Sequence, residues 1–327
     1  MRRMGAEGWR CKVKKVKGLI NKKSVKHALK NKCTVLYMTL SYINSGYINH
    51  QMIYICIYYM RKVISFCVWG DSHIYNYGLY ENALLLESIF PDWIMYVYYT
   101  KTANKKVIKE LKRMKNVECE YVNVPNHYKN TMLRFLAGFD ITNDVVIFRD
   151  ADSRLMKRDY YLVEDWLNNS DKDVHIIRDH PANKSRILAG LWGVRNKLLA
   201  TPEHILKFWE FYQAPDTEKW TLDEFFLSRY IYPLVKDRTR IHAQFNRFEA
   251  WATDMPRTVI INGKTIPFPS RKQGFCGMTI TYLPNASKKF NLARTSYKKK
   301  RVKWNLFHRA KPYSFQKNHN LLKKIKI

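Results

Sequence analysis

The stretch DVVIFRDADSR, residues 144–154, decides the fold of this chain. Its four consecutive apolar residues, three of them β-branched, predict a strand that is buried on both faces. The strand is followed by two carboxylates, Asp150 and Asp152, and strand alternation directs both to the same side of the chain. Open α/β sheets bind their ligands beyond the carboxyl ends of their strands. The acidic pair therefore marks a candidate site.

Two carboxylates are too few to enclose a hard cation by themselves. Mg²⁺ or Mn²⁺ held by Asp150 and Asp152 would complete its coordination with water and with the phosphates of a ligand. The pair therefore predicts a metal-dependent enzyme that acts on a diphosphate compound. The alternative interpretation is a solvated turn with a capping aspartate.

Strands and helices are predicted to alternate on both sides of this stretch. Strands are expected over residues 63–69, 93–99, 118–124, 144–148 and 174–177. Helices are expected at 79–90, after a cap at Asn104, at 131–139 and 160–168, after a cap at Thr201, and from 221 to 232 before Pro233. Residues 189–195, AGLWGVR, are expected to form a glycine-punctuated turn. The pattern predicts an α/β fold with a mostly parallel central sheet covered on both faces.

The charge of the chain is unevenly distributed. The 58 Lys and Arg against 27 Asp and Glu give a formal net charge of +31. Residues 1–59 carry +11 and residues 255–327 carry +18, which leaves +2 for residues 60–254. The basic ends are expected either to bind nucleic acid, an anionic membrane or an acidic partner, or to be solvated tails.

This distribution suggests three parts: a basic N-terminal extension (1–59), a central domain (60–284) and a basic C-terminal tail (285–327). Met60 is interpreted as the natural start of the domain, which makes residues 1–59 an extension outside it. Residues 33–59 are long enough to span a bilayer, but several polar residues near their middle disfavour a membrane anchor. No signal peptide is recognisable. No cysteine pair has metal-ligand spacing, and this pattern of cysteines is typical of a protein in a reducing compartment.

Several short segments, taken together and in order, carry a resemblance to a known family. They are residues 78–82 (GLYEN), 90–93 (FPDW), 133–136 (LRFL), 148–155 (FRDADSRL), 165–167 (DWL), 178–181 (RDHP), 189–195 (AGLWGVR), 223–227 (DEFFL) and 232–233 (YP). Over roughly residues 60–280 the chain resembles GT-A glycosyltransferases, and more narrowly the group found in large algal DNA viruses of the chlorovirus type and in some bacteria. The resemblance implies a three-layer α/β/α sandwich with a Rossmann-like nucleotide-binding half.

The resemblance also implies a function. The chain would move a sugar from a nucleoside-diphosphate sugar to a hydroxyl acceptor such as a glycan, with Mn²⁺ or Mg²⁺. Asp152 would be the direct metal ligand, and Asp150 would contact the nucleotide ribose or reach the metal through water. Asp223 would face the acceptor hydroxyl as the base of an inverting reaction, with Glu224 as the helix cap; in a retaining reaction it would only position groups. The protein would work in the cytoplasm, the host's if it is viral, without an obligate protein partner.

The sequence contains further candidate residues for the binding site. Arg134, Arg149 and Arg154 are expected either to hold the nucleotide sugar and the carboxylates or to form structural ion pairs. His180 is a candidate contact of the donor or acceptor sugar, with a buried, satisfied histidine as the competing interpretation, and the late His242 is a candidate third metal ligand. Gly190 to Gly193, with Trp192, is expected to form a wall of the sugar site, and a plain core tryptophan is the competing interpretation.

Two other functions stay open. Haloacid-dehalogenase-type phosphohydrolases also have Asp-x-Asp after an apolar strand, although usually after the first strand of their core. A nucleic-acid-binding protein is the other candidate, because Tyr297, Trp304, Phe307 and Tyr313 lie among the lysines of the tail.

Overall fold

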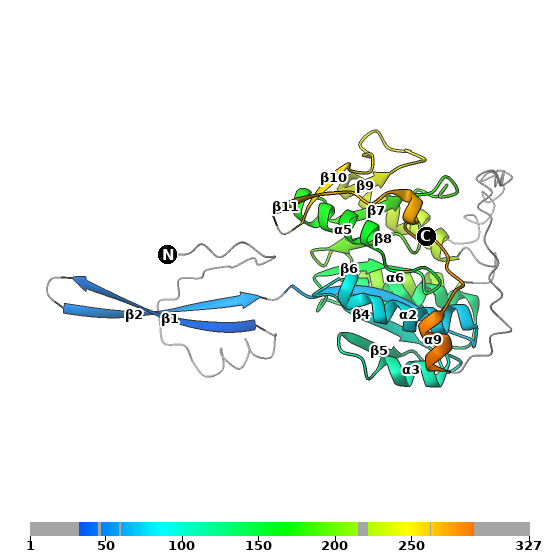
Figure 1. Ribbon diagram of the computed structural model, residues 1–327, viewed down its shortest axis with the longest axis horizontal. Coiled ribbons are helices and arrows are strands. Elements are labelled where there is room, and N and C mark those ends of the chain that lie inside the picture. The colour runs from blue at the N-terminus through cyan, green and yellow to red at the C-terminus, as the bar shows by residue number, and fades with distance from the viewer. Residues whose placement is uncertain (1–32, 45–46, 59, 215–221, 262, 291–327) are drawn as a thin grey trace.

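A seven-stranded sheet forms the centre of the molecule. The computed structural model describes residues 33–44, 47–58, 60–214, 222–261 and 263–290. The sheet has the strand order β5-β4-β3-β6-β8-β7-β9 (Figure 1). Its strands are β3 (Lys62–Val68), β4 (Ile94–Tyr99), β5 (Val117–Tyr121), β6 (Val145–Phe148), β7 (Val174–Arg178), β8 (Trp192–Arg195) and β9 (Thr239–Ala243). Only β8 runs antiparallel to its neighbours, so the predicted mostly parallel α/β sheet is confirmed.

Helices cover both faces of this sheet. They are α2 (His73–Ile89), α3 (Lys105–Leu111), η1 (Tyr128–Phe135), α4 (Leu136–Phe139), α5 (Lys157–Asn169), α6 (Pro202–Gln213), α7 (Leu222–Phe226), η2 (Leu227–Ile231), α8 (Tyr232–Val235) and η3 (Lys236–Arg238). The predicted cap residues are confirmed, since Asn104 accepts hydrogen bonds from the first turn of α3 and Thr201 accepts one from the first turn of α6.

Strand alternation divides the interior into two cores. Ile64 and Ile147 face one core, which α2, α3 and α5 cover. Val63, Val146 and Phe148 face the other core, which η1, α6 and α7 cover. Because β6 is buried on both faces, its carboxyl end is held rigidly between the two layers. The predicted three-layer sandwich is thus formed.

Residues 192–195 depart from the sequence prediction. They form β8, a strand inserted between β6 and β7, and not part of a turn. A Cβ atom on Gly193 would lie 2.8 Å from Ile147 Cγ2 and 2.9 Å from the Val146 carbonyl oxygen. The glycine therefore permits close packing inside the sheet.

The helix from Leu222 also departs from the prediction, because it continues beyond Tyr232. The π-helical turn η2 precedes α8, and Pro233 lies in the first turn of α8, where a missing backbone N–H is tolerated. Thr221, expected to begin this helix, lies outside the described residues.

Before Met60 the sequence pattern predicts no element. The structure has an antiparallel pair there, β1 (Cys33–Asn44) and β2 (Tyr47–Tyr58), which pairs with no strand of the seven-stranded sheet. This range is rich in β-branched and aromatic residues, which favour strands. The described residues include no helix that is both long and apolar enough to cross a membrane.

The last described segment returns across the sheet to the end of β6. It contains the hairpin of β10 (Thr258–Ile261) and β11 (Lys264–Pro267), then η4 (Arg271–Gln273) and α9 (Pro284–Lys289). The Ile280 amide donates to the Asp152 carbonyl oxygen. Glu81 of α2 accepts hydrogen bonds from the Asn285 and Ala286 amides at 2.9 and 2.8 Å. The predicted domain boundary at 284 therefore falls at the first residue of a helix that is bound to α2.

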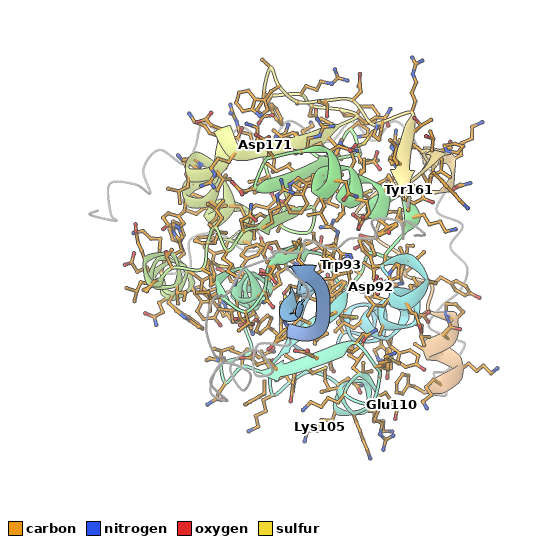
Figure 2. All side chains as sticks on the ribbon, turned by 90° about the vertical axis from the view of Figure 1, so that its left-hand side faces the viewer. Asp92, Trp93, Lys105, Glu110, Tyr161 and Asp171 are labelled. Carbon is orange, nitrogen blue, oxygen red and sulfur yellow. The ribbon has the colours of Figure 1, made fainter. Side chains whose placement is uncertain are left out.

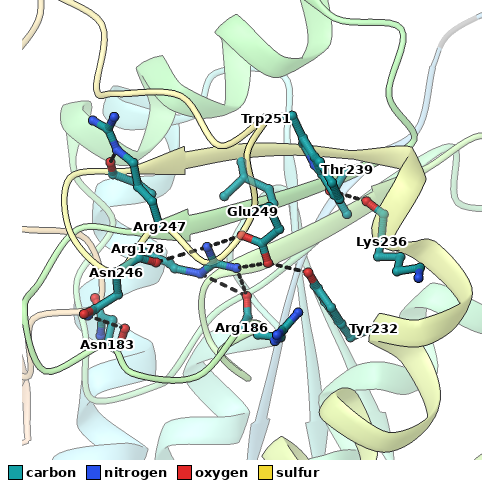
Figure 3. A network of polar contacts seen from close by, with 12 residues as sticks. Arg178, Asn183, Arg186, Tyr232, Lys236, Thr239, Asn246, Arg247, Glu249 and Trp251 are labelled. Atoms are coloured by element: carbon teal, nitrogen blue, oxygen red, sulfur yellow. Dashed lines mark hydrogen bonds and ion pairs between the residues drawn. The ribbon is translucent and has the colours of Figure 1, made fainter.

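Besides Arg134–Asp223, three arginine–carboxylate pairs are buried in the molecule, and we call these three the closed ion pairs. They are Arg149–Asp159, Arg158–Asp179 and Arg178–Glu249. In the last pair, Arg178 donates to both Glu249 oxygens at 2.6 and 2.9 Å, and the Tyr232 hydroxyl also bonds to Glu249 (Figure 3). The Arg178 and Glu249 side chains are 0% and 2% exposed.

Candidate active site

The acidic pair lies in a tight turn immediately after β6. The Arg149 amide donates to the Ser65 carbonyl oxygen and so extends the pairing of β3 with β6. The Ser153 amide and hydroxyl both donate to the Asp150 carbonyl oxygen, at 3.2 and 2.9 Å. These bonds fix the turn that carries the two carboxylates beyond the carboxyl edge of the sheet.

Two glycines make room for this turn. A Cβ atom on Gly190 would lie 2.0 Å from Asp150 Oδ2, and one on Gly78 would lie 2.1 Å from the Ala151 carbonyl oxygen. A side chain at Gly78 would clash with the backbone of the acidic turn, and one at Gly190 would displace the Asp150 carboxylate. Gly190 therefore contributes to the site by its missing side chain, as a direct neighbour of the Asp150 carboxylate.

Arg134 joins two of the predicted acids. From the end of η1 it donates to Asp150 Oδ1 and to Asp223 Oδ2, each at 2.6 Å. Asp223 and Arg134 are buried, while the Asp150 side chain is 39% exposed. Burial raises the pKa of Asp223, and Arg134 opposes that shift. Arg134 thus holds the Asp150 and Asp223 carboxylates close to each other, as expected of a residue that fixes the carboxylates.

Asp152 is the less compensated member of the pair. Its Oδ2 accepts a hydrogen bond from the Thr279 hydroxyl at 3.1 Å, and no salt bridge to it is formed by the described residues. Burial, and then the negative charge of Asp150, raise its pKa. Tyr75 of α2, which is partly exposed, lies near the two carboxylates. Its partial burial, and then the negative charges of Asp152 and Asp150, raise its pKa as well.

Two predicted ligand contacts are wrong, because the side chains lie in the interior. Arg149 donates to both oxygens of Asp159 at 2.8 and 2.7 Å and to two backbone carbonyls, so it belongs to a closed ion pair. Trp192 is 1% exposed and stacks on Phe148 with ring centroids 4.3 Å apart, so it forms core and not the wall of a sugar site. Arg154 donates to backbone carbonyls around the turn, including that of Ile280.

His242 does not complete a metal site with the acidic pair. Its two ring nitrogens contact His175 Nε2 at 2.8 Å and Asp165 Oδ2 at 3.0 Å, in a network that joins β9 to β7 and α5. Burial lowers the pKa of His242 and lowers that of His175 well below its usual value. Within the described ranges, no three His, Cys, Asp or Glu side chains group as a metal ion would require. The predicted set of Asp150, Asp152 and His242 is therefore wrong.

His180 and Glu224 lie at the margins of the site. The His180 ring stacks on Phe275 with centroids 4.2 Å apart, its Nδ1 accepts from the Ala182 amide, and burial lowers its pKa. Glu224 accepts a hydrogen bond from the Ser185 hydroxyl at 2.9 Å, and burial raises its pKa. Its predicted partner in a helix cap, Thr221, lies outside the described residues.

The residues at the turn suit a divalent cation that a ligand completes. Two adjacent carboxylates, one with a raised pKa and no counter-ion among the described residues, would be stabilised by added positive charge. Their small number leaves most of the coordination shell to water and phosphate oxygens, which is the usual way Mg²⁺ is held with nucleotides. The structure alone thus defines an α/β protein with an open acidic site at the carboxyl edge of its sheet.

Comparison with known proteins adds the following. No family model matches the chain, and no curated protein is significantly similar to it in sequence. Among solved structures, the galactosyltransferase LgtC with donor and acceptor sugar analogues is 14% identical, with a TM-score of 0.40 over 63% of this chain and 84% of that one. A glycosyltransferase involved in glycosylation of the PBCV-1 major capsid protein is 12% identical, with a TM-score of 0.36 over 56% and 82%.

A third similar structure, TarS from S. aureus, is 15% identical with a TM-score of 0.36, over 51% of this chain and 54% of that one. A synthase of 4-diphosphocytidyl-2C-methyl-D-erythritol from Anaerococcus prevotii also matches, at 9% identity and a TM-score of 0.34 over 52% and 85%. Two of these four neighbours are glycosyltransferases by name. All four TM-scores lie below 0.5, so the functional conclusion is drawn from the site itself.

Proposed function

We propose that this chain is a metal-dependent glycosyltransferase, which moves a sugar from a nucleoside-diphosphate sugar to a hydroxyl group of a glycan. The observation that carries the proposal is the open acidic turn after β6, in which Asp152 has a raised pKa and no salt bridge among the described residues. Carboxyl groups with perturbed pKa values at the carboxyl edge of an α/β sheet are typical of a functional site.

Asp152 would bind Mn²⁺ or Mg²⁺ directly, and Asp150 would contact the nucleotide ribose or a metal-bound water. When bound, the cation stabilises the negative charge that develops on a departing diphosphate. The protein's own contribution is to keep the two carboxylates in place. Arg134 fixes Asp150, Gly190 leaves space for its carboxylate, and Thr279 donates to Asp152.

Asp223 is the proposed proton acceptor if the reaction inverts the sugar configuration. Burial raises its pKa, which brings it closer to the range that suits a base near neutral pH. Its Oδ1 accepts a hydrogen bond from the Glu224 amide and its Oδ2 accepts one from Arg134, so the carboxylate has a fixed orientation. If the reaction retains the configuration, Asp223 is a positioning residue that acts through Arg134 on Asp150.

The test is a panel of nucleotide sugars incubated with Mn²⁺, with release of the nucleoside diphosphate as the readout. We expect slow hydrolysis of one donor, abolished by a chelator and reduced at least about 100-fold in Asp152→Asn, since a metal site contributes several kcal/mol. Asp92→Asn, which changes an exposed aspartate before β4, is the matched control and should keep full activity.

Two outcomes would contradict the proposal. One is a folded protein that neither binds nor cleaves any donor in a broad panel. The other is release of inorganic phosphate from simple phosphate esters without a sugar donor, which would favour the phosphohydrolase. Against the latter, three strands of the same sheet, β3, β4 and β5, precede β6. Cytoplasmic residence and binding of nucleic acid by the basic ends stay predictions, because residues 1–32 and 291–327 lie outside the described residues.

A further inference from the structure

A concave site lies at the opposite edge of the sheet from the acidic turn. It is a cavity of about 530 Å³ at the amino ends of β7 and β9. Its lining residues are Asn169, Ser170, Asp171, Lys172, Asp237, Thr239, Arg240 and Trp251. Since β6 and β7 both run antiparallel to β8, they point the same way, and the amino end of β7 is remote from the carboxyl end of β6. Asp171, labelled in Figure 2, lies on the side of the molecule that faces the viewer, far from Lys105 and Glu110 of α3.

We propose that this cavity is a glycan-binding site for a neutral oligosaccharide, separate from the acidic turn. The inference goes beyond the proposed transfer reaction and does not depend on it. It rests on three features of the lining: a fixed aromatic face, carboxylates available as acceptors, and a balanced charge.

The aromatic face belongs to Trp251, whose side chain is 46% exposed. Its Nε1 donates to Thr239 Oγ1 at 3.1 Å, and that hydroxyl donates to the Lys236 carbonyl oxygen at 2.7 Å (Figure 3). The indole is therefore oriented before any ligand arrives, so little side-chain entropy is lost on binding. A rigid aromatic surface beside polar groups is the usual combination in small-molecule sites, and the apolar C–H face of a sugar ring packs well on it.

The polar groups around Trp251 differ in what they offer. Lys172 Nζ donates to the Asp237 carbonyl oxygen at 3.2 Å, and Arg240 pairs with Asp165 at 2.9 Å, so both cations are engaged by the protein. The Asp171 and Asp237 carboxylates are exposed and form no hydrogen bond or salt bridge with the described residues. Carboxylate oxygens accept hydrogen bonds strongly, and sugar hydroxyls are good donors.

The charge of the lining points to a neutral ligand. Two cationic and two anionic side chains give it a formal net charge of zero, in a chain whose formal net charge is +31. A phosphate-rich ligand would select a cationic surface, and its binding would weaken steeply with salt. A polyhydroxylated, uncharged ligand meets the same groups without an electrostatic penalty. This combination favours a neutral oligosaccharide over nucleic acid or a charged nucleotide.

The experiment uses the full chain on an array of immobilised oligosaccharides, neutral and sulfated, with a chelator present and no nucleotide sugar. We expect binding of at least one neutral oligosaccharide that persists at high salt. Trp251→Ala should weaken it at least about tenfold, which corresponds to roughly 1.4 kcal/mol. Trp251→Phe keeps an aromatic face and should bind within a few-fold of the natural chain, and Tyr121→Ala, an aromatic of similar exposure on β5, should not change binding.

The double change Asp171→Asn and Asp237→Asn tests the acceptors without removing apolar surface, and we expect it to weaken binding as well. Asp152→Asn should leave binding unchanged, so a failure of the glycosyltransferase proposal is distinguishable from a failure of this one. Three results would overturn the inference: no neutral oligosaccharide is bound, binding survives Trp251→Ala in a folded variant, or only sulfated ligands are bound and are lost at high salt.

Discussion

The acidic turn and the closed ion pair of Arg178 and Glu249 use the same residue types, but the pKa values of their carboxyl groups are shifted in opposite directions. In the Arg178–Glu249 pair, burial by itself would raise the pKa of Glu249, but hydrogen bonds from Arg178 and then Tyr232 outweigh burial and lower it. At the acidic turn, burial raises the pKa of Asp152 and of Asp223 despite the nearby Arg134. An arginine next to a carboxylate is therefore not by itself a sign of function. The sign is an acid whose charge the protein leaves partly uncompensated.

The largest expected effect lies in the closed ion pairs and concerns stability. Glu249→Gln keeps the size of the side chain but leaves Arg178 buried without a counter-charge. Loss of one partner of a buried pair costs about 3–5 kcal/mol in the free energy of unfolding. Urea denaturation measures this, and Glu87→Gln on the exposed side of α2 is the control, expected within about 0.5 kcal/mol of the natural chain. A loss in Glu249→Gln no larger than that in Glu87→Gln would show that the closed ion pair of Arg178 and Glu249 does not contribute to stability.

The next effect lies at the acidic turn and concerns activity. Gly190→Ala introduces a methyl group whose carbon would lie 2.0 Å from Asp150 Oδ2, so the carboxylate must move. Misplacement of a reacting group by about 1 Å can cost on the order of 100-fold in rate. We expect kcat/KM for donor hydrolysis to fall roughly 10- to 100-fold in a variant that still folds. Full activity in Gly190→Ala would show that the position of Asp150 does not matter.

The third prediction concerns pH and the buried histidines. His175 and His242 have pKa values lowered mainly by burial, so the folded protein holds them neutral. A histidine with a lowered folded pKa stabilises the protein above its unfolded pKa of about 6.5, and that stability is lost as the pH falls. Between pH 7 and pH 5 we expect the free energy of unfolding to drop by up to about 1.4 kcal/mol per pH unit for each proton taken up.

Denaturation curves at several pH values measure this slope. His73→Gln, an exposed histidine at the start of α2, should leave the slope unchanged. A flat profile between pH 7 and pH 5 would contradict the buried neutral network. At lower pH the Asp165 carboxylate should add to the loss, because hydrogen bonds from His242 and Asn169 overcome burial and lower its pKa.

The sequence predicts the layers of this fold and the place of the acidic turn because both depend on local patterns. The apolar run of β6 and its two acids can be read within a few residues, and so can the caps Asn104 and Thr201. Arg149 follows β6 directly and lies in the interior, whereas Asp150 and Asp152 belong to the turn beyond the strand, where the alternation of a strand no longer applies. The two acids are placed by the hydrogen bonds of that turn, and the interior role of Arg149 depends on its distant partner Asp159.

The remainder of the site depends on contacts between distant residues. Thr279 donates a hydrogen bond to Asp152 although the two residues are 127 positions apart in the sequence, and no local pattern predicts that contact. The glycines of 189–195 look like turn residues, whereas Gly193 is required by the packing of a strand inserted into the sheet. The prediction of His242 as a metal ligand is wrong because its partners, His175 and Asp165, come from β7 and α5.

The smallest expected effect is the most discriminating, because it separates function from stability at one residue. Asp152 has a folded pKa above its unfolded value, so its ionised form at neutral pH is held at a cost to the native state. Asp152→Asn removes that charge and keeps the Thr279 hydrogen bond available through the amide oxygen. We expect the free energy of unfolding at pH 7 to stay within about 0.5 kcal/mol of the natural chain or to rise, while donor hydrolysis is lost. A clear fall in the free energy of unfolding would mean that the ionised Asp152 carboxylate stabilises the folded protein, as that of Glu249 does. The acidic turn would then belong with the closed ion pairs.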